Sequence, residues 1–454
     1  MTVDRQRLPE PTETRGLRFP DITRSTLAPG FNLWTVERND LPLVHLLWLW
    51  HAGSAVDAAS ACGLASLTAD MLDEGTVDLT MPRLHDALAR VGGQLDTDIG
   101  HDATVLSLTA LSAHRARAVG LLVGMAEHPR LEDSDFERVR SLRLNRVRQL
   151  RYSASALADL VTMRHLYGAH PYGRPTIGTE ESLPGFDVDL VRARHELYRR
   201  TPVTLVAVGD ITHAECERLV RAELTPAARS TVTEPEGELP AAGPRMVFVP
   251  RQGSAQSEVR VARVGAARDT PDYHALVVTN TLLGGAFVSR INSKLREEKG
   301  VTYGARSSFQ FYRRPGPFVV QCSVQSDATA ASVVDILTEL EDLGGQRAVT
   351  EAELRSAQGA LTRGYARGFE TAEQVARSAA QLALFDLPAD TFDRFVDRVE
   401  AVTAADVTRL ARTWLDRQAM RAVVVGDPVS ARQGLDEAGM GVREEPPPGA
   451  AGPG

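Results

Sequence analysis

The chain has 454 residues, of which 43% are hydrophobic and 24% charged, and its formal net charge is −8 with a pI of about 5.8. These proportions are typical of globular domains, and the length predicts two or three of them. The acidic balance argues against a nucleic-acid-binding protein and against attraction to an anionic membrane surface.

The N-terminal segment and the cysteines bear on location. Residues 1–18 are polar and contain proline, without the apolar stretch of a signal peptide. The apolar run 41–50 is about half the length of a membrane span and reads better as a buried strand. The three cysteines lie far apart without a C-x-x-C pair, which is typical of a reducing compartment. We therefore expect a cytoplasmic protein with no membrane partner.

Strand and helix patterns are mixed along the chain. Apolar periodicity predicts strands at 41–50, 103–110, 301–311 and 317–324, and helices at 64–72, 81–91, 131–150, 271–283 and 351–365. Asp133 to Asp135 could cap the start of the helix at 131–150. This order predicts the α+β class, with helices packed on largely antiparallel sheets.

An internal repeat divides the chain into two halves. The motif at 206–210, VAVGD, recurs as VVVGD at 423–427, and the same offset of 217 residues aligns 41–50 with 258–267. A shared offset at both ends of a half indicates duplication. The predicted division is an N-terminal extension at 1–23, a domain at 24–228, a linker rich in Pro, Glu, Thr and Ala at 229–245, a second domain at 246–430, and a disordered tail at 431–454.

The most informative segment is 63–72, GLASLTADML, followed by Glu-Gly-Thr at 74–76. It resembles the active-site helix of the pitrilysin/insulinase family of zinc peptidases, G-L-A-H-x-x-E-H-M-L followed by G-T. In that family the two His bind zinc and the Glu activates a zinc-bound water. Here Ser66, Ala69 and Asp70 occupy the three positions. Ser and Ala cannot replace an imidazole or a general base.

Further fragments extend the resemblance over residues 24–427. They are HPYGRP at 170–175, IGTEE at 177–181, YRRTP at 198–202, LGG at 283–285 and LREEKGVTY at 295–303. Each fragment is weak alone, but their order and spacing are those of the family. The resemblance implies two homologous α+β domains, each a mainly antiparallel sheet packed with helices.

The resemblance also implies that the zinc site is lost. The family's third ligand is a Glu roughly 75 residues after the second His. Counting from Asp70 leads to Asn145, and no Glu occurs between Glu137 and Glu180. All four positions are thus degenerate, and we expect no metal or other cofactor in this chain.

Other metal sites have little support in the sequence. No two of the 11 His are three or four residues apart, so no helical His pair exists. Asp70, Asp73 and Glu74 could form an acidic cluster, but a solvated helix end is the favoured interpretation.

Arg296 and Tyr303, seven residues apart, match the pair that binds the substrate backbone near the zinc in the family, with Gly284 and Gly285 beside them in the substrate-binding motif. A guanidinium can grip a peptide carbonyl or carboxylate, and a Tyr hydroxyl can stabilise a developing oxyanion. The structural alternative is that Arg296 is a solvated helix residue and Tyr303 belongs to a strand core.

These features favour a non-zinc subunit of a heterodimeric metallopeptidase. Its expected partners are a paralogous subunit that carries the zinc and a peptide substrate, bound in extended form by strand addition. The alternative is an inert structural or peptide-holding scaffold, similar to the non-catalytic core subunits of respiratory complexes. A self-sufficient peptidase with unusual ligands is a third, less favoured hypothesis.

Overall fold

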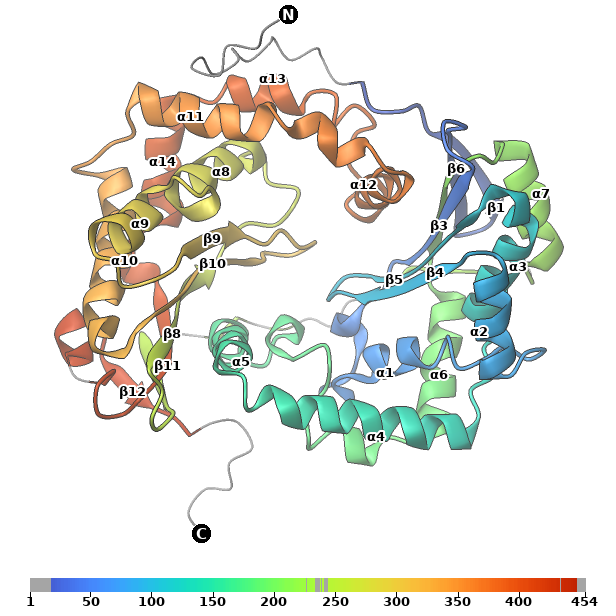
Figure 1. The fold of residues 1–454 in the computed structure, drawn as a ribbon, viewed down its shortest axis with the longest axis horizontal. Coiled ribbons are helices and arrows are strands. Elements are labelled where there is room, and N and C mark those ends of the chain that lie inside the picture. The colour runs from blue at the N-terminus through green and yellow to red at the C-terminus, as the bar shows by residue number, and fades with distance from the viewer. Residues whose placement is uncertain are drawn as a thin grey trace, which may run out of the picture.

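A computed structural model describes residues 18–446, except 226, 233–236, 238, 241–243 and 433. It contains two six-stranded sheets, one in each half of the chain (Figure 1). Four of the five strand pairings in the first sheet and three of the five in the second are antiparallel. The predicted class, two α+β domains with mainly antiparallel sheets, is confirmed.

The N-terminal sheet has the strand order β1-β2-β6-β3-β5-β4. Its strands are β1 (Thr23–Ala28), β2 (Phe31–Glu37), β3 (Leu43–Trp50), β4 (Gln94–Ile99), β5 (Thr104–Leu111) and β6 (Val203–Gly209). The central strand β3 is buried on both faces: Leu46, Trp48 and Trp50 pack in the main core of this half, whereas Leu47 and Leu49 pack on the opposite face. Side chains alternate across a strand, so this division follows from the sequence pattern.

The C-terminal sheet has the order β12-β7-β11-β8-β10-β9. Its strands are β7 (Met246–Pro250), β8 (Gln256–Val264), β9 (Ala305–Phe309), β10 (Pro317–Gln325), β11 (Arg421–Gly426) and β12 (Val442–Glu444). The repeated V-G-D motif ends β6 in one sheet and β11 in the other. Each of these strands lies in the interior of its sheet, next to β3 and β8 respectively.

Helices surround both sheets. Those of the first half are α1 (Leu64–Asp70), α2 (Met81–Arg90), α3 (Arg115–Glu127), α4 (Asp133–Leu150), α5 (Ala154–Tyr167), α6 (Val188–Arg200) and α7 (His213–Glu223). Those of the second half are α8 (Tyr273–Asn280), α9 (Arg290–Asn292), α10 (Thr329–Gly344), α11 (Glu351–Thr362), α12 (Ala372–Leu384), α13 (Phe395–Glu400) and α14 (Ala404–Trp414). The start of α4 lacks the predicted side-chain cap, because Glu132 is its N-cap residue and makes no capping hydrogen bond.

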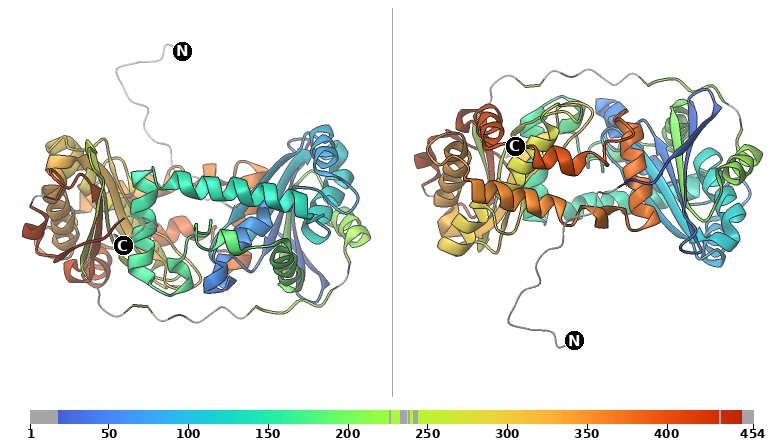
Figure 2. Two further views of the ribbon diagram at one scale, coloured as in Figure 1. Left: turned by 90° about the horizontal axis from the view of Figure 1, so that it is seen from below. Right: turned by 90° about the horizontal axis from the view of Figure 1, so that it is seen from above.

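The two halves exchange helices. Helix α5 of the first half packs through Leu157, Ala158 and Val161 on the C-terminal sheet, and α12 of the second half packs on the N-terminal sheet (Figure 1). Figure 2 shows α4 extending from the first half toward the second, where α5 turns alongside the other sheet. The exchange fixes the halves relative to one another, since separating them would expose both apolar contacts.

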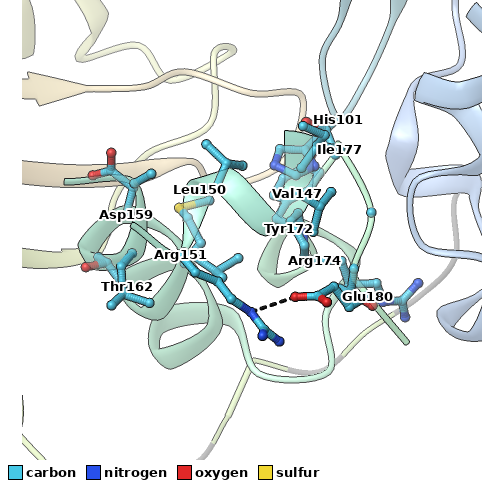
Figure 3. Close-up of a pocket in the computed structure, with 18 of the residues that line it drawn as sticks. His101, Val147, Leu150, Arg151, Asp159, Thr162, Tyr172, Arg174, Ile177 and Glu180 are labelled. Carbon is cyan, nitrogen blue, oxygen red and sulfur yellow. Dashed lines mark ion pairs between the residues drawn. The ribbon is translucent and has the colours of Figure 1, made fainter. Parts of the chain in front are cut away.

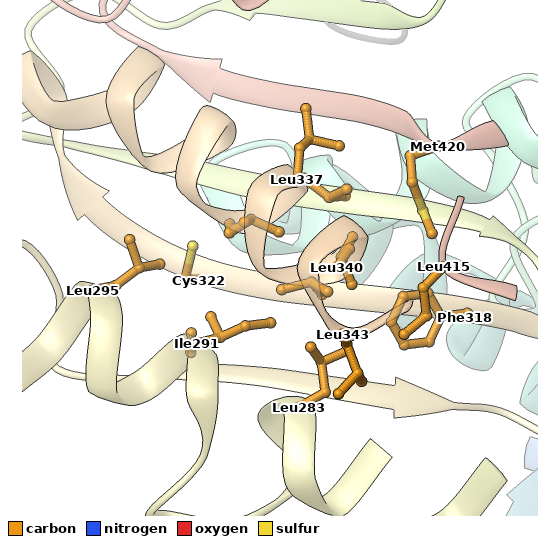
Figure 4. Close-up of a cluster of buried hydrophobic side chains, with 14 of the residues drawn as sticks. Leu283, Ile291, Leu295, Phe318, Cys322, Leu337, Leu340, Leu343, Leu415 and Met420 are labelled. Atoms are coloured by element: carbon orange, nitrogen blue, oxygen red, sulfur yellow. The ribbon is translucent and has the colours of Figure 1, made fainter. Parts of the chain in front are cut away.

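The largest core belongs to the second half (Figure 4). It joins the inner face of the sheet, including Phe318 and Cys322, to α10 through Leu337, Leu340 and Leu343. The segments on either side of α9 are π-helical, at Thr281–Gly285 and Ser293–Glu298. A predicted helix at 271–283 thus ends as a wider turn, a feature that is frequent at functional sites.

Two boundary predictions need correction. Part of the tail expected to be disordered from residue 431 is folded: Ala431, Leu435 and Met440 join the core and β12 pairs with β7. In the expected linker, Arg229 is buried and pairs with Glu127 of α3, so this residue belongs to the N-terminal core. The predicted N-terminal extension falls mostly outside the described residues. Within the described ranges, no helix combines the length and apolar character needed to cross a membrane.

Candidate functional site

Helix α1, which carries the degenerate zinc motif, is held by its N-terminus. The carboxylate of Asp57 accepts a hydrogen bond from the Ala65 amide at 2.9 Å. It also forms an ion pair with Arg194. Burial raises the pKa of Asp57, and the positive charge of Arg194 opposes that shift. Gly63 has a φ of 93° and its backbone lies against Gly178, so a side chain at Gly63 would clash. These two motif glycines are required by close backbone contact.

Two of the three residues that replace the zinc-motif side chains are small and buried, and the third, Asp70, forms an ion pair. Ser66 and Ala69 lie in the buried face of α1, whereas Asp70 pairs with Arg143 of α4. The Arg143 side chain is only 6% exposed and also donates to the Ser66 carbonyl oxygen at 3.4 Å. A guanidinium therefore lies beside the position where the zinc motif would place a cation. Burial raises the pKa of the Asp70 carboxyl, and Arg143 opposes the shift.

A cavity of about 640 Å³ lies beside this pair, between α1, α2, α4 and β4. We call it the α1 cavity; its wall includes Ala69, Asp70, Asp73, Glu74, Arg143 and Arg146. Asn145, the counted third-ligand position, is exposed on α4 and is not part of this wall. Two of the acidic residues in this wall form ion pairs: Asp70 with Arg143 and Glu74 with Arg138. Burial, with the neighbouring Glu74, raises the pKa of Asp73.

The residues of the α1 cavity do not fit a zinc ion. Across the described ranges, no three His, Cys, Asp or Glu side chains gather in a way that could hold a metal ion. Arg143 would repel a cation beside Asp70. We expect the purified chain to contain no stoichiometric zinc by elemental analysis and a chelator to leave its melting temperature unchanged. Roughly one zinc per chain that a chelator removes would contradict this prediction.

The residues predicted to bind substrate come together in a second cavity of about 490 Å³, which we call the Arg/Tyr cavity. Arg296, Tyr303, Gly284 and Gly285 all line it. It shares no lining residue with the α1 cavity. The pair and the degenerate motif therefore line separate cavities of this chain.

The surroundings of Arg296 and Tyr303 differ from those expected if Arg296 were only a solvated helix residue and Tyr303 only part of a strand core. Tyr303 lies just before β9 and is 94% exposed, so its ring is not strand core. The Arg296 guanidinium carbon lies 3.9 Å from the centre of the Phe287 ring, and Phe287 is itself 70% exposed. A cation stacked on an aromatic face is held in place without being neutralised. Arg296 also forms a weaker contact with Glu297 at 3.4 Å.

The two glycines have a structural reason for being glycine. A Cβ on Gly284 would lie 2.7 Å from the Ser307 Oγ, and one on Gly285 would lie 2.8 Å from the Asn280 Nδ2. Gly284 lets the first π-helical turn approach β9, and Gly285 lets the same turn lie against Asn280 of α8. Their role in binding substrate stays a prediction.

The inner end of the Arg/Tyr cavity is polar. Arg260 of β8 is buried and pairs with Asp159 of α5 at 2.6 Å and with Glu258 at 3.0 Å. Glu258 also accepts a hydrogen bond from Ser323 at 2.5 Å. The cluster could not be predicted from the sequence, because Arg260 and Asp159 lie on segments far apart in the chain. The stacking of Phe287 joins it to the nearby residue Arg296, but no sequence motif marks that contact. The pairing of Arg143 with Asp70 had one signal in the sequence. Several arginines occur on α4, and an acidic residue, Asp70, stands where the zinc motif has its second His.

Comparisons with known proteins agree with these features. Residues 44–180 match the family described as insulinase (peptidase family M16), and residues 189–361 match the peptidase M16 inactive domain. An uncharacterized zinc protease of Mycobacterium leprae is 25% identical over 428 residues, which cover 91% of this chain and 93% of the relative. A Helicobacter pylori protein named a non-peptidase homolog is 21% identical over 327 residues, 71% of this chain and 74% of its own.

Solved structures share the fold. A peptidase M16 inactive domain from Pseudomonas fluorescens has a TM-score of 0.82 at 24% identity, over 90% of this chain and 99% of that chain. A chain of complex III2 from Candida albicans has a TM-score of 0.78 at 13% identity, over 93% of this chain and 100% of its own.

Proposed function

Since the chain belongs to the insulinase family, peptidase family M16, we propose that it is the non-zinc subunit of a heterodimeric metallopeptidase. It would supply Arg296 and Tyr303 to a zinc site on a paralogous subunit. The observation that carries the proposal is the exposure of Tyr303 beside Arg296 in one cavity, apart from the α1 cavity. This exposure supports a role in which both side chains reach a ligand that a second subunit presents.

The chemistry assigns different tasks to the two residues. Arg296 keeps its charge and its donors while stacked on Phe287, so it can hold a peptide carbonyl in the ground state and in the transition state. The Tyr303 hydroxyl can donate to the oxygen that becomes negative when the zinc-bound water attacks. The partner's zinc would activate that water. An extended peptide would bind by adding a strand to a sheet edge. The proposal also keeps the cytoplasmic location that was expected from the sequence.

A catalytically inert scaffold is the second candidate. It is favoured by the Helicobacter pylori relative that is named a non-peptidase homolog and by the packing role of Gly284 and Gly285. A scaffold would assemble with its partner, but Arg296 and Tyr303 would not affect turnover. Reconstitution with a zinc-bearing chain of the family from the same genome therefore separates the two candidates.

In that reconstituted pair, Arg296→Ala is expected to raise KM by roughly 10-fold or more, with a smaller effect on kcat, because a backbone clamp acts on ground state and transition state alike. The measurement is steady-state peptide hydrolysis, with assembly checked by size exclusion. Arg355→Ala is a matched control, since Arg355 lies on α11 and is 71% exposed in a loose pair with Glu351. An unchanged KM in Arg296→Ala would favour the scaffold.

A further inference from the structure

One face of the C-terminal sheet is only partly covered. Helix α5 packs over β11 and β7 through Leu157, Ala158 and Val161, and it approaches β8 where Asp159 meets Arg260. Beyond β8 lie β10 and the edge strand β9. On β10, Phe318, Val320, Cys322 and Val324 point into the core on the other face. The alternate residues Val319, Gln321 and Ser323 therefore point toward the side occupied by α5.

Two cavities lie in line along this face. The Arg/Tyr cavity includes Gln321 and Ser323, and a cavity of about 520 Å³ includes Val319 and Gln321. We call the second one the α5 cavity. Gln321 lines both, so the two adjoin. From Val319 to Ser323 the strand rises about 13 Å, which an extended peptide covers with about four residues.

The α5 cavity has an apolar lining drawn from both halves of the chain (Figure 3). The apolar residues are Val147 and Leu150 of α4, Leu157, Leu160 and Met163 of α5, Pro175 and Ile177, and Val319 of β10. Tyr172 and Tyr312 add aromatic surface where the halves meet, and their rings lie 5.0 Å apart. A concave apolar surface of this size is typical of sites that accept an apolar group.

Several charged groups around the α5 cavity already have partners, including Arg174, which donates to the carbonyl oxygens of Asp57 and Ala169. Glu180 forms ion pairs with Arg151 at 2.7 Å and with Arg148 at 3.1 Å, and the first is drawn in Figure 3. Asp159 is already paired with Arg260. A charged ligand would have to compete with these pairs, whereas an apolar group needs only to displace water from the lining. The lining therefore selects for an apolar ligand.

We propose that the α5 cavity is a specificity pocket for a bulky aliphatic or aromatic side chain of a peptide that passes over the face of β10 from the Arg/Tyr cavity, without pairing with that interior strand. The proposal rests on the proposed function, because it takes the peptide to be held by Arg296 and Tyr303. It narrows the substrate class to peptides with a large apolar residue about four positions from the residue at that pair. The pocket combines both halves of the chain, so it exists only when they are assembled.

The test uses the full chain and fluorescein-labelled peptides that are identical except for Phe or Ser at one scanned position, with binding followed by anisotropy. At one position the Phe peptide should bind on the order of 10-fold more tightly. Ala156→Phe, which fills the cavity from α5, and Leu160→Asp, which charges its lining, should each bring this ratio close to unity. Leu190→Asp is the control, because Leu190 is 38% exposed on α6 outside the cavity.

The outcomes separate this proposal from the proposed function. If Arg296→Ala weakens both peptides while the cavity variants leave the Phe-to-Ser ratio unchanged, the pocket is refuted and the proposed function stands. If the cavity variants abolish the ratio while Arg296→Ala has no effect, the pocket stands and the role of Arg296 is refuted. No binding of either peptide, or equally tight binding of N-acetyl-phenylalanine amide alone, overturns the peptide pocket. Circular dichroism of each variant shows that the fold is retained.

Discussion

Tyr303→Phe is expected to lower kcat of the reconstituted pair on the order of 10²–10³-fold, while complex formation and the zinc content of the partner stay unchanged. The substitution removes only the hydroxyl and keeps the ring. Because Tyr303 is 94% exposed, no buried hydrogen bond is lost and the stability of the chain should not change. A fall in kcat would therefore report on an oxyanion contact made in the transition state.

Tyr152→Phe is the matched control for this variant. Tyr152 follows α4, is 79% exposed, and lines neither the Arg/Tyr cavity nor the α1 cavity. The decisive measurement is peptide hydrolysis by pairs that contain each variant, at saturating substrate. Wild-type turnover with Tyr303→Phe would remove the main reason to treat this chain as a catalytic contributor, and the scaffold hypothesis would replace it.

Asp70→Ala is expected to lower the free energy of unfolding by about 3 kcal/mol, because it leaves the Arg143 guanidinium buried without its counter-charge. We expect a loss at the lower end of the range of free energies measured when one partner of a buried ion pair is removed, because the Asp70 side chain is 37% exposed and solvent screens its charge. The measurement is urea unfolding of the purified chain, followed by circular dichroism and analysed for the change in midpoint at constant slope.

Two variants test the cause. Asp73→Ala removes a neighbouring acid of the same cavity that makes no ion pair with another described residue, and it should change stability by no more than about 0.5 kcal/mol. The double variant Asp70→Ala/Arg143→Met should recover much of the loss, because it removes both charges. A loss as large for Asp73→Ala as for Asp70→Ala would show that the cost is unrelated to Arg143.

The family and its architecture could be predicted from the sequence, because they depend on local patterns. The alternation of Leu46, Leu47 and Trp48 determines which side chains face each side of β3, and the cores confirm it. The order of the family motifs was enough to identify the family. The loss of both His and the general base is likewise a property of residues 66, 69 and 70 alone.

Contacts between distant segments could not be predicted in this way. Counting along the chain led to Asn145, but the helical rotation of α4 turns Arg143 and Arg146 toward α1 and leaves Asn145 exposed. The Pro- and Gly-rich end suggested a disordered tail, yet Ala431 and Met440 are buried in the core of the second half.

The amino-acid sequence thus determined the fold class, the family and the loss of the two His and the Glu from the motif, since each follows from which residue types stand at which local spacing. Only the tertiary structure decided what replaced the metal position, which face of α4 meets α1, and that Tyr303 is exposed beside Arg296. It also brought α5 against the sheet of the other half and so formed the α5 cavity. Most of these features depend on packing between different helices and strands, such as the pairing of Asp70 of α1 with Arg143 of α4, which local periodicity does not encode.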